Sequence, residues 1–191
     1  TNQGTTGVEI LVNGKVETAA TASTTKVDGK TVTTVTVDDK KVEEKLQSEG
    51  NYAVVTIPVK GDSDIIIGQL NGQTVKNMEN KEAILEVRTD KATYTIPASQ
   101  INIDAVSENL GGQVELKDIT VSVKIAAAAE DTAKIVEDTA NKNNYQIIVK
   151  PIEFEITCTS GGREVEISKF NAYVERLIPI PKGIDPSKIT T

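Results

Sequence analysis

Histidine and tryptophan are both missing from this chain of 191 residues, and there is a single cysteine, Cys158. Histidine is the side chain that most often serves as a general base near neutral pH and as a metal ligand, and tryptophan often anchors binding surfaces. One cysteine cannot form a disulfide within the chain. Its setting in the strand-like stretch ITCTS predicts a small core residue and not a reactive thiol. We therefore expect no enzyme activity, no cofactor and no metal site.

Aromatic residues are also scarce, at 3% of the chain against 38% for all apolar residues. The core must therefore consist mainly of Val, Ile and Leu. A tyrosine on an exposed strand can stack on a sugar ring, which keeps carbohydrate binding open as an alternative. We expect the tyrosines to lie in strands, mostly in the core or at a sheet edge; they are Tyr52, Tyr94, Tyr145 and Tyr173.

The formal net charge of −7 argues against a nucleic-acid partner. Nucleic acids select a basic surface that replaces the counterions of the phosphates, and no cluster of Lys and Arg supplies one. Apolar runs such as Ile65–Ile67 and Ile125–Ala129 are far shorter than the roughly 20 residues that cross a bilayer. The opening TNQGTTG lacks the basic and apolar regions of a signal peptide. We expect a chain that does not span a membrane.

Two pairs of glutamates have the spacing of neighbours on one strand face. Glu153 and Glu155 lie in PIEFEIT, and Glu164 and Glu166 lie in REVEI. A pair of catalytic carboxylates in a glycosidase would look the same in sequence. The solvated face of an antiparallel sheet explains both pairs without chemistry, and we prefer this interpretation.

Asp62 and Asp64 have the D-x-D spacing of a calcium-binding loop. The glycine at the sixth position and the glutamate at the twelfth position of such a loop are missing, so the indication of calcium is weak. The chain also lacks the sequence motifs of nucleotide-binding loops, acyl-transfer enzymes and zinc sites.

Apolar and polar residues alternate with a period of two near the N-terminus, which indicates half-buried strands. Asn13-Gly14 and Asp28-Gly29 are strong signals of two-residue hairpin turns. We therefore expect an antiparallel meander from Val8 to Val37. Pro58 lacks a backbone donor and should lie at an edge or at a strand end. Further strands are predicted within 52–59, 64–70, 83–89, 92–97, 116–125, 145–160, 163–170 and 172–180.

Helical spacing appears first in residues 38–50, where Val42 and Leu46 lie one turn apart and Gly50 can end the helix. A polar turn or short helix is predicted at Asn71–Lys81, and another helix at Val106–Leu110. A further helix should span roughly 128–142, with one apolar face formed by Ala129, Ala133, Val136 and Ala140.

Strand signals dominate, so the predicted fold class is mainly β, an antiparallel β-sandwich-like fold with two or three short covering helices. One β-rich module should span residues 1–178. A strand–helix–strand unit at 30–60 is echoed at 91–125, which suggests an internal duplication. Three prolines make 179–191 an expected stiff, extended linker. The core-facing residues before this linker are predicted to be Val165, Ile167, Tyr173, Val174 and Leu177.

Three segments carry a resemblance to a known family: VEILVNGK at 8–15, the stretch GQLNGQTVKN to VSENL at 68–110, and KFNAYVERLIPIPKGIDPSKITT at 169–191. They resemble non-catalytic modules of Gram-positive cell-surface proteins that carry S-layer homology (SLH) domains. The resemblance extends over most of the chain. It implies a secreted, extracellular module associated with the cell wall or S-layer, whose partners are the neighbouring domains of a larger surface protein. It transfers no catalytic residues.

Three hypotheses on function follow. A structural spacer or adaptor module is favoured. A carbohydrate-binding module for cell-wall or plant polysaccharide is the alternative, although the missing tryptophan argues against it. The third is an enzyme, including one that processes itself near its C-terminal end.

Overall fold

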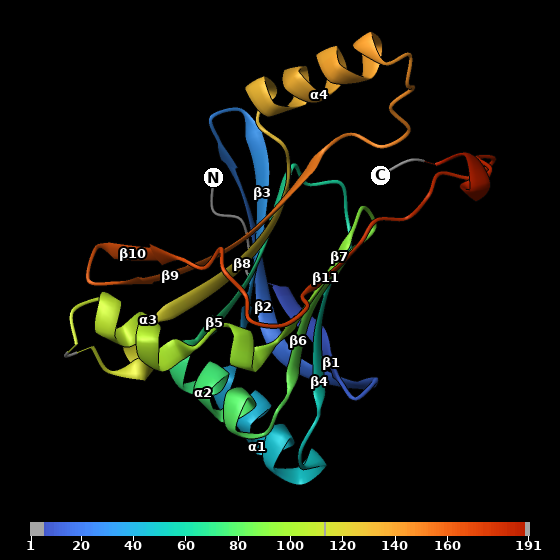
Figure 1. The fold of residues 1–191 in the computed structure, drawn as a ribbon. Coiled ribbons are helices and arrows are strands. Elements are labelled where there is room, and N and C mark those ends of the chain that lie inside the picture. The colour runs from blue at the N-terminus through green and yellow to red at the C-terminus, as the bar shows by residue number, and fades with distance from the viewer. Residues whose placement is uncertain (1–5, 113, 190–191) are drawn as a thin grey trace.

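A computed structural model describes residues 6–112 and 114–189, and its fold is mainly β, as predicted (Figure 1). Four α-helices and three short 3₁₀ helices accompany eleven strands in this part of the chain. The strands are β1 (Thr6–Val12), β2 (Lys15–Val27), β3 (Lys30–Val37), β4 (Val54–Val59), β5 (Ile65–Asn71), β6 (Ile84–Thr89), β7 (Thr93–Pro97), β8 (Thr120–Ala127), β9 (Ile152–Ser160), β10 (Arg163–Glu166) and β11 (Glu175–Leu177). The helices are α1 (Asp39–Glu49), α2 (Gly72–Asn80), α3 (Ile103–Asn109), α4 (Glu130–Lys142), η1 (Ala98–Gln100), η2 (Leu116–Asp118) and η3 (Pro186–Lys188).

All eleven strands belong to one curled sheet in the order β10-β9-β8-β5-β3-β2-β1-β4-β6-β7-β11. One half of the sheet runs from β10 to β1 and the other from β4 to β11. The two halves meet where β1 pairs with β4, over the residue pairs Leu11–Thr56 and Val12–Val55 alone. The halves approach each other closely at Gly68 of β5. A Cβ atom there would lie 3.1 Å from Val87 Cγ2 on β6 and 3.2 Å from Ile57 Cδ1 on β4. The eleven strands thus form one curled sheet, where a β-sandwich-like fold was predicted.

The sheet is mixed, because β3 pairs parallel with β5 and β4 pairs parallel with β6. Both parallel pairs arise because the chain passes between the two halves of the sheet, through α1 from β3 to β4 and through α2 from β5 to β6. A wholly antiparallel sheet is thus ruled out, although the other pairings are antiparallel. Pro58 of β4 pairs with Arg88 of β6 on one side. On its other side it lies beyond the short β1–β4 contact, so β1 does not require the backbone N–H that proline lacks.

The predicted N-terminal meander is confirmed. β1, β2 and β3 pair antiparallel in sequence order. Asn13 and Gly14 have φ angles of 50° and 77°, and Asp28 and Gly29 have φ angles of 50° and 80°. Positive φ at both central positions is what a type I′ turn requires, and this requirement explains the Asn-Gly and Asp-Gly pairs.

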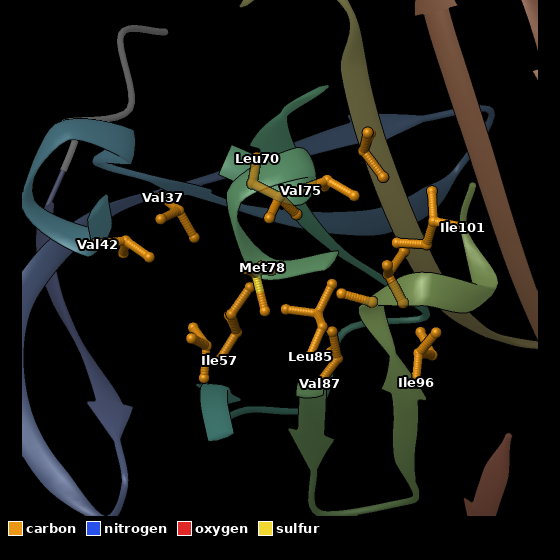
Figure 2. Packing of buried hydrophobic residues seen from close by; sticks show 14 of the residues in the cluster. Val37, Val42, Ile57, Leu70, Val75, Met78, Leu85, Val87, Ile96 and Ile101 are labelled. Carbon is orange, nitrogen blue, oxygen red and sulfur yellow. The ribbon is translucent and has the colours of Figure 1, made fainter. Parts of the chain in front are cut away.

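Helices α1, α2 and α3 lie together on one side of the sheet (Figure 1). The predicted contacts of α1 are confirmed, since Val42 and Leu46 are buried and Gly50, with φ of 80°, ends the helix. Met78 of α2 points into the core toward Ile57 and Leu85 of the sheet (Figure 2). The core is almost wholly aliphatic, as the composition predicts.

Helix α4 forms where it was predicted, but it does not cover the sheet. No residue of α4 is buried, and Ile135 is 67% exposed. β8 and β9 pair as far as Ala127 and Ile152, so the helix belongs to a connection beyond the end of the sheet (Figure 1). The amphipathic pattern predicted the helix correctly and its burial wrongly.

The C-terminal segment differs from the prediction. Val165, Ile167 and Val174 are partly buried against the core, but Tyr173 is 97% exposed and Leu177 is 53% exposed. The chain leaves the sheet after β10 and returns only for the three residues of β11. The alternation of core-facing and exposed residues therefore does not continue from β10 into β11. The described part of the expected linker, residues 179–189, is bent and not continuously extended, because it contains a turn at Lys182–Gly183 and helix η3. Residues 190 and 191 lie outside the described residues.

The two stretches that suggest a duplication, 30–60 and 91–125, both pass from one half of the sheet to the other through a helix. They do so in opposite directions. An internal duplication stays a prediction.

Candidate functional site

The chain crosses from one end of the curled sheet to the other between β10 and β11. β10 is the first strand in the sheet order and β11 is the last. β11 pairs antiparallel with β7, with Glu175 opposite Thr95 and Leu177 opposite Thr93. Residues 171–181, which contain β11, are called the strap below. The strap brings the two ends of the sheet into one structural junction.

Arg176 is the central side chain of this junction. Its guanidinium carbon lies 5.1 Å from the ring centre of Tyr94, 5.8 Å from that of Phe154 and 6.0 Å from that of Phe170. Tyr94 and Phe154 meet edge to face, with ring centres 5.2 Å apart. Each ring can attract the cation through its π face, by about 0.5–1 kcal/mol at an exposed site. Arg176 therefore joins β11 to β7 and β9, which stand near opposite ends of the sheet.

Tyr94 is the buried member of this cluster. Its side chain is almost completely inaccessible, and burial raises the pKa of its phenol, while the nearby guanidinium of Arg176 acts in the opposite direction. The phenol is therefore held neutral at physiological pH. It supplies a ring face and a weak polar contact of 3.5 Å to Arg176 Nη2.

A second attachment holds the start of the strap. The side-chain oxygen of Gln100, Oε1, accepts hydrogen bonds from the backbone N–H groups of Asn171, at 2.7 Å, and Ala172, at 2.8 Å. Gln100 belongs to η1, which follows β7 directly. The strap is thus fixed to the β7 side of the sheet both before and within β11.

A cavity of about 340 Å³ lies beneath the end of the strap. Its walls are largely apolar and come from Ile66 of β5, Ile125 of β8 and Ile152 of β9. Pro179 and Pro181 of the strap form another wall. This size is at the lower end of the range of small-molecule sites. Charged side chains at its border are Asp64, Asp90, Lys91 and Lys150.

Of the four glutamates considered from the sequence, Glu153 and Glu155 make contacts that stabilise the fold. Glu155 pairs with Lys124 on the neighbouring strand β8. Glu153 Oε1 accepts a 3.0 Å hydrogen bond from the backbone N–H of Ala129, next to the start of α4. Glu164 and Glu166 lie exposed on β10 at the sheet edge. Charges there discourage the edge from pairing with another chain.

Asp62 and Asp64 bind different partners. Asp62 lies 2.8 Å from Lys91 Nζ, and the hydrogen bond and charge of this lysine lower the pKa of the Asp62 carboxyl. Asp64 Oδ2 accepts a 2.7 Å hydrogen bond from the backbone N–H of Thr31. The loop therefore ties β5 to the β2–β3 hairpin and to the β6–β7 turn. Within the described residues, no group of three or more Cys, Asp or Glu side chains is arranged to hold a metal ion.

The tyrosines do not form a common binding platform. Only Tyr94 lies in a strand and in the core, so the prediction that all four lie in strands is wrong. Tyr52 follows α1, and Tyr145 follows α4 at the opposite end of the molecule (Figure 1). Tyr173 lies in the strap. The exposed rings therefore belong to separate parts of the surface.

Cys158 lies on β9 and is completely buried, as predicted. Burial raises the pKa of its thiol to about 12. Only the thiolate is a good nucleophile, so the folded protein keeps this side chain inert at neutral pH.

No known protein family, curated protein or solved structure matches this chain. The resemblance to modules of SLH-domain surface proteins therefore stays a prediction. In the part of the chain that the structure describes, no helix is long and apolar enough to cross a membrane. Among the described residues, the junction around Arg176 joins β11 at one end of the sheet to Phe154 near the other, and it is the candidate site.

Proposed function

We propose that the chain is a non-catalytic structural module of a secreted, cell-wall-attached surface protein, in which it acts as a spacer or adaptor between neighbouring domains. The resemblance of three sequence segments to such modules supports the location. The observation that carries the mechanical role is the contact of Arg176 with Tyr94, Phe154 and Phe170. It fixes the chain to both ends of the sheet shortly before the proline-rich segment.

A spacer must set the direction in which the chain leaves the folded body. The two hydrogen bonds to Gln100 and the pairing of β11 with β7 position the strap up to Leu177. Pro179 and Pro181 follow at once, and each proline limits its own backbone to φ near −65°. The direction of the chain is therefore restricted as far as Pro181, before the turn at Lys182–Gly183.

The direction of exit can be measured by placing nitroxide spin labels at Lys40→Cys on α1 and Lys182→Cys after the strap. Cys158 is buried and leaves these two cysteines as the sites of labelling. Double electron–electron resonance should give one narrow distance distribution. Arg176→Ala in the same background should broaden it. A distribution in the parent that is as broad as that of Arg176→Ala would contradict the spacer role.

Carbohydrate binding remains the alternative, and one experiment separates it from the spacer. The chain is incubated with isolated cell-wall sacculi and with an array of cell-wall and plant glycans. We expect retention no greater than that of an unrelated acidic protein of similar size. Saturable binding to either material would overturn the non-catalytic spacer as the main role and favour a carbohydrate-binding module.

A further inference from the structure

The strap is attached to the rest of the fold by few interactions. β11 has only three residues, and all three are exposed. Beyond the backbone pairing with β7, the side-chain attachment of β11 is the Arg176 cluster. The segment before β11 has the two hydrogen bonds to Gln100 and the partly buried side chain of Val174. The strands of the N-terminal meander, in contrast, pair over long stretches and contribute several buried residues to the aliphatic core.

Segments with few buried contacts open at a smaller free-energy cost than the core, and they do so as local units. Opening of the strap would expose the outer edge of β7 and the faces of Tyr94 and Phe154. It would also remove Pro179 and Pro181 from the wall of the 340 Å³ cavity. The apolar surfaces of Ile66, Ile125 and Ile152 would then become accessible from that side.

We infer that residues 171–181 form a latch, which detaches from β7 as one unit while the rest of the sheet stays folded and which opens the apolar cavity beneath it. Arg176 is the residue that holds the latch closed, because it contacts rings from both ends of the sheet. Leu177 is the last residue of β11, so tension from the C-terminal side loads the Leu177–Thr93 pair first and the Arg176–Tyr94 pair next. This role of tension rests on the proposed spacer function, whereas local opening does not.

Hydrogen exchange of the complete chain, followed by mass spectrometry over a series of low denaturant concentrations, tests the latch. The strap amides should exchange faster than those of β1–β3 and with little dependence on denaturant, which is the signature of local opening. Arg176→Ala should accelerate exchange in the strap by roughly fivefold, the effect of losing about 1 kcal/mol of cation–π attraction. The amides of β1–β3 should keep their rates. Lys182→Ala, which removes an exposed cation just beyond the strap, is the control and should leave the strap unchanged.

A locked variant gives the reverse test. Thr93 and Leu177 lie directly opposite each other, so Thr93→Cys with Leu177→Cys can form a cross-strand disulfide. Oxidation should slow strap exchange toward the rate of global unfolding, and reduction should restore it. If the reduced strap already exchanges with the rate and denaturant dependence of β1–β3, the latch is wrong, whatever the result with sacculi. If the strap opens locally but sacculi are bound, the latch stands and the spacer function fails.

Discussion

The carboxylate of Glu79 accepts a 2.8 Å hydrogen bond from the backbone N–H of Ile103 and thereby joins α2 to the first residue of α3. The first N–H groups of a helix have no partner within the helix, and the preceding residue, Asn102, makes no side-chain cap. Lys76 lies 3.6 Å from the same carboxylate and 2.5 Å from Asp104. Glu79 thus performs, from another helix, the task that a cap residue usually performs.

Glu79→Ala should therefore lower the free energy of unfolding by about 1–2 kcal/mol, because the buried N–H of Ile103 loses its acceptor. Glu79→Gln keeps an acceptor oxygen and should cost clearly less. Chemical denaturation at pH 7 measures both. Equal losses in the two variants would show that charge, and not the hydrogen bond, is what matters at this position.

The effect of pH on the stability that Glu79 contributes has a defined sign. Burial is the main cause that raises the pKa of Glu79 in the folded state. The folded protein therefore binds the proton more readily than the unfolded chain, so this group adds stability as the pH falls through its raised pKa. The stability of the parent relative to Glu79→Gln should improve as the pH is lowered from 7. A difference that shrinks or reverses on acidification would contradict this environment for Glu79.

Gly72 stands at the start of α2 in close contact with backbone. A Cβ atom at this position would lie 2.6 Å from the carbonyl oxygen of Leu116, which belongs to η2 and cannot move aside as a side chain can. Alanine normally stabilises a helix relative to glycine. Here Gly72→Ala should instead destabilise the protein by about 1–3 kcal/mol. Gly68→Ala is the comparison, since its new methyl group meets only side-chain atoms of Val87 and Ile57, and thermal melts should show a smaller loss for it.

Local elements were well predicted from the sequence because their signals are local. The Asn-Gly and Asp-Gly pairs specify their turns through positive φ, and the spacing of Val42 and Leu46 specifies the buried face of α1. The order of the strands was not predictable in this way. The parallel pairing of β3 with β5 depends on a connection that runs through α1 and β4, and no pattern within β3 or β5 records it.

The junction at the strap escaped prediction for a related reason. Arg176 contacts rings that come from three distant positions in the sequence, Tyr94, Phe154 and Phe170. Alternating patterns report which residues face a core, but they say nothing about which cation a ring will meet. The scarcity of aromatic residues was the available signal, because half of the six gather around this one guanidinium.

Cys158 provides a test at alkaline pH. Its folded pKa of about 12 lies above the ordinary value of a thiol, so the unfolded chain loses this proton first as the pH rises. Stability due to this group should fall between about pH 8.5 and pH 12. Between pH 8 and pH 10 the parent should lose about 2 kcal/mol more than Cys158→Ala, which cannot ionise. Urea denaturation at the two pH values gives the difference, and parallel pH profiles for the two proteins would contradict it.

Tyr173 and Val174 are adjacent in the strap but differ in environment, and this contrast allows a test with a matched control. Val174 is partly buried against the aliphatic core, whereas Tyr173 is 97% exposed. An aspartate at position 174 would lose part of its hydration where the valine now packs against the aliphatic core, and partial burial of a charge is costly. Val174→Asp should lower the free energy of unfolding, or that of strap opening, by about 1–3 kcal/mol. Tyr173→Asp introduces the same charge one residue earlier and should change either quantity by less than about 0.5 kcal/mol.

Thermal melts report the free energy of global unfolding, and hydrogen exchange reports that of strap opening. Equal effects of the two substitutions would show that Val174 does not anchor the strap to the core, whereas a loss confined to strap exchange would place Val174 with Arg176 among the residues that hold the latch closed.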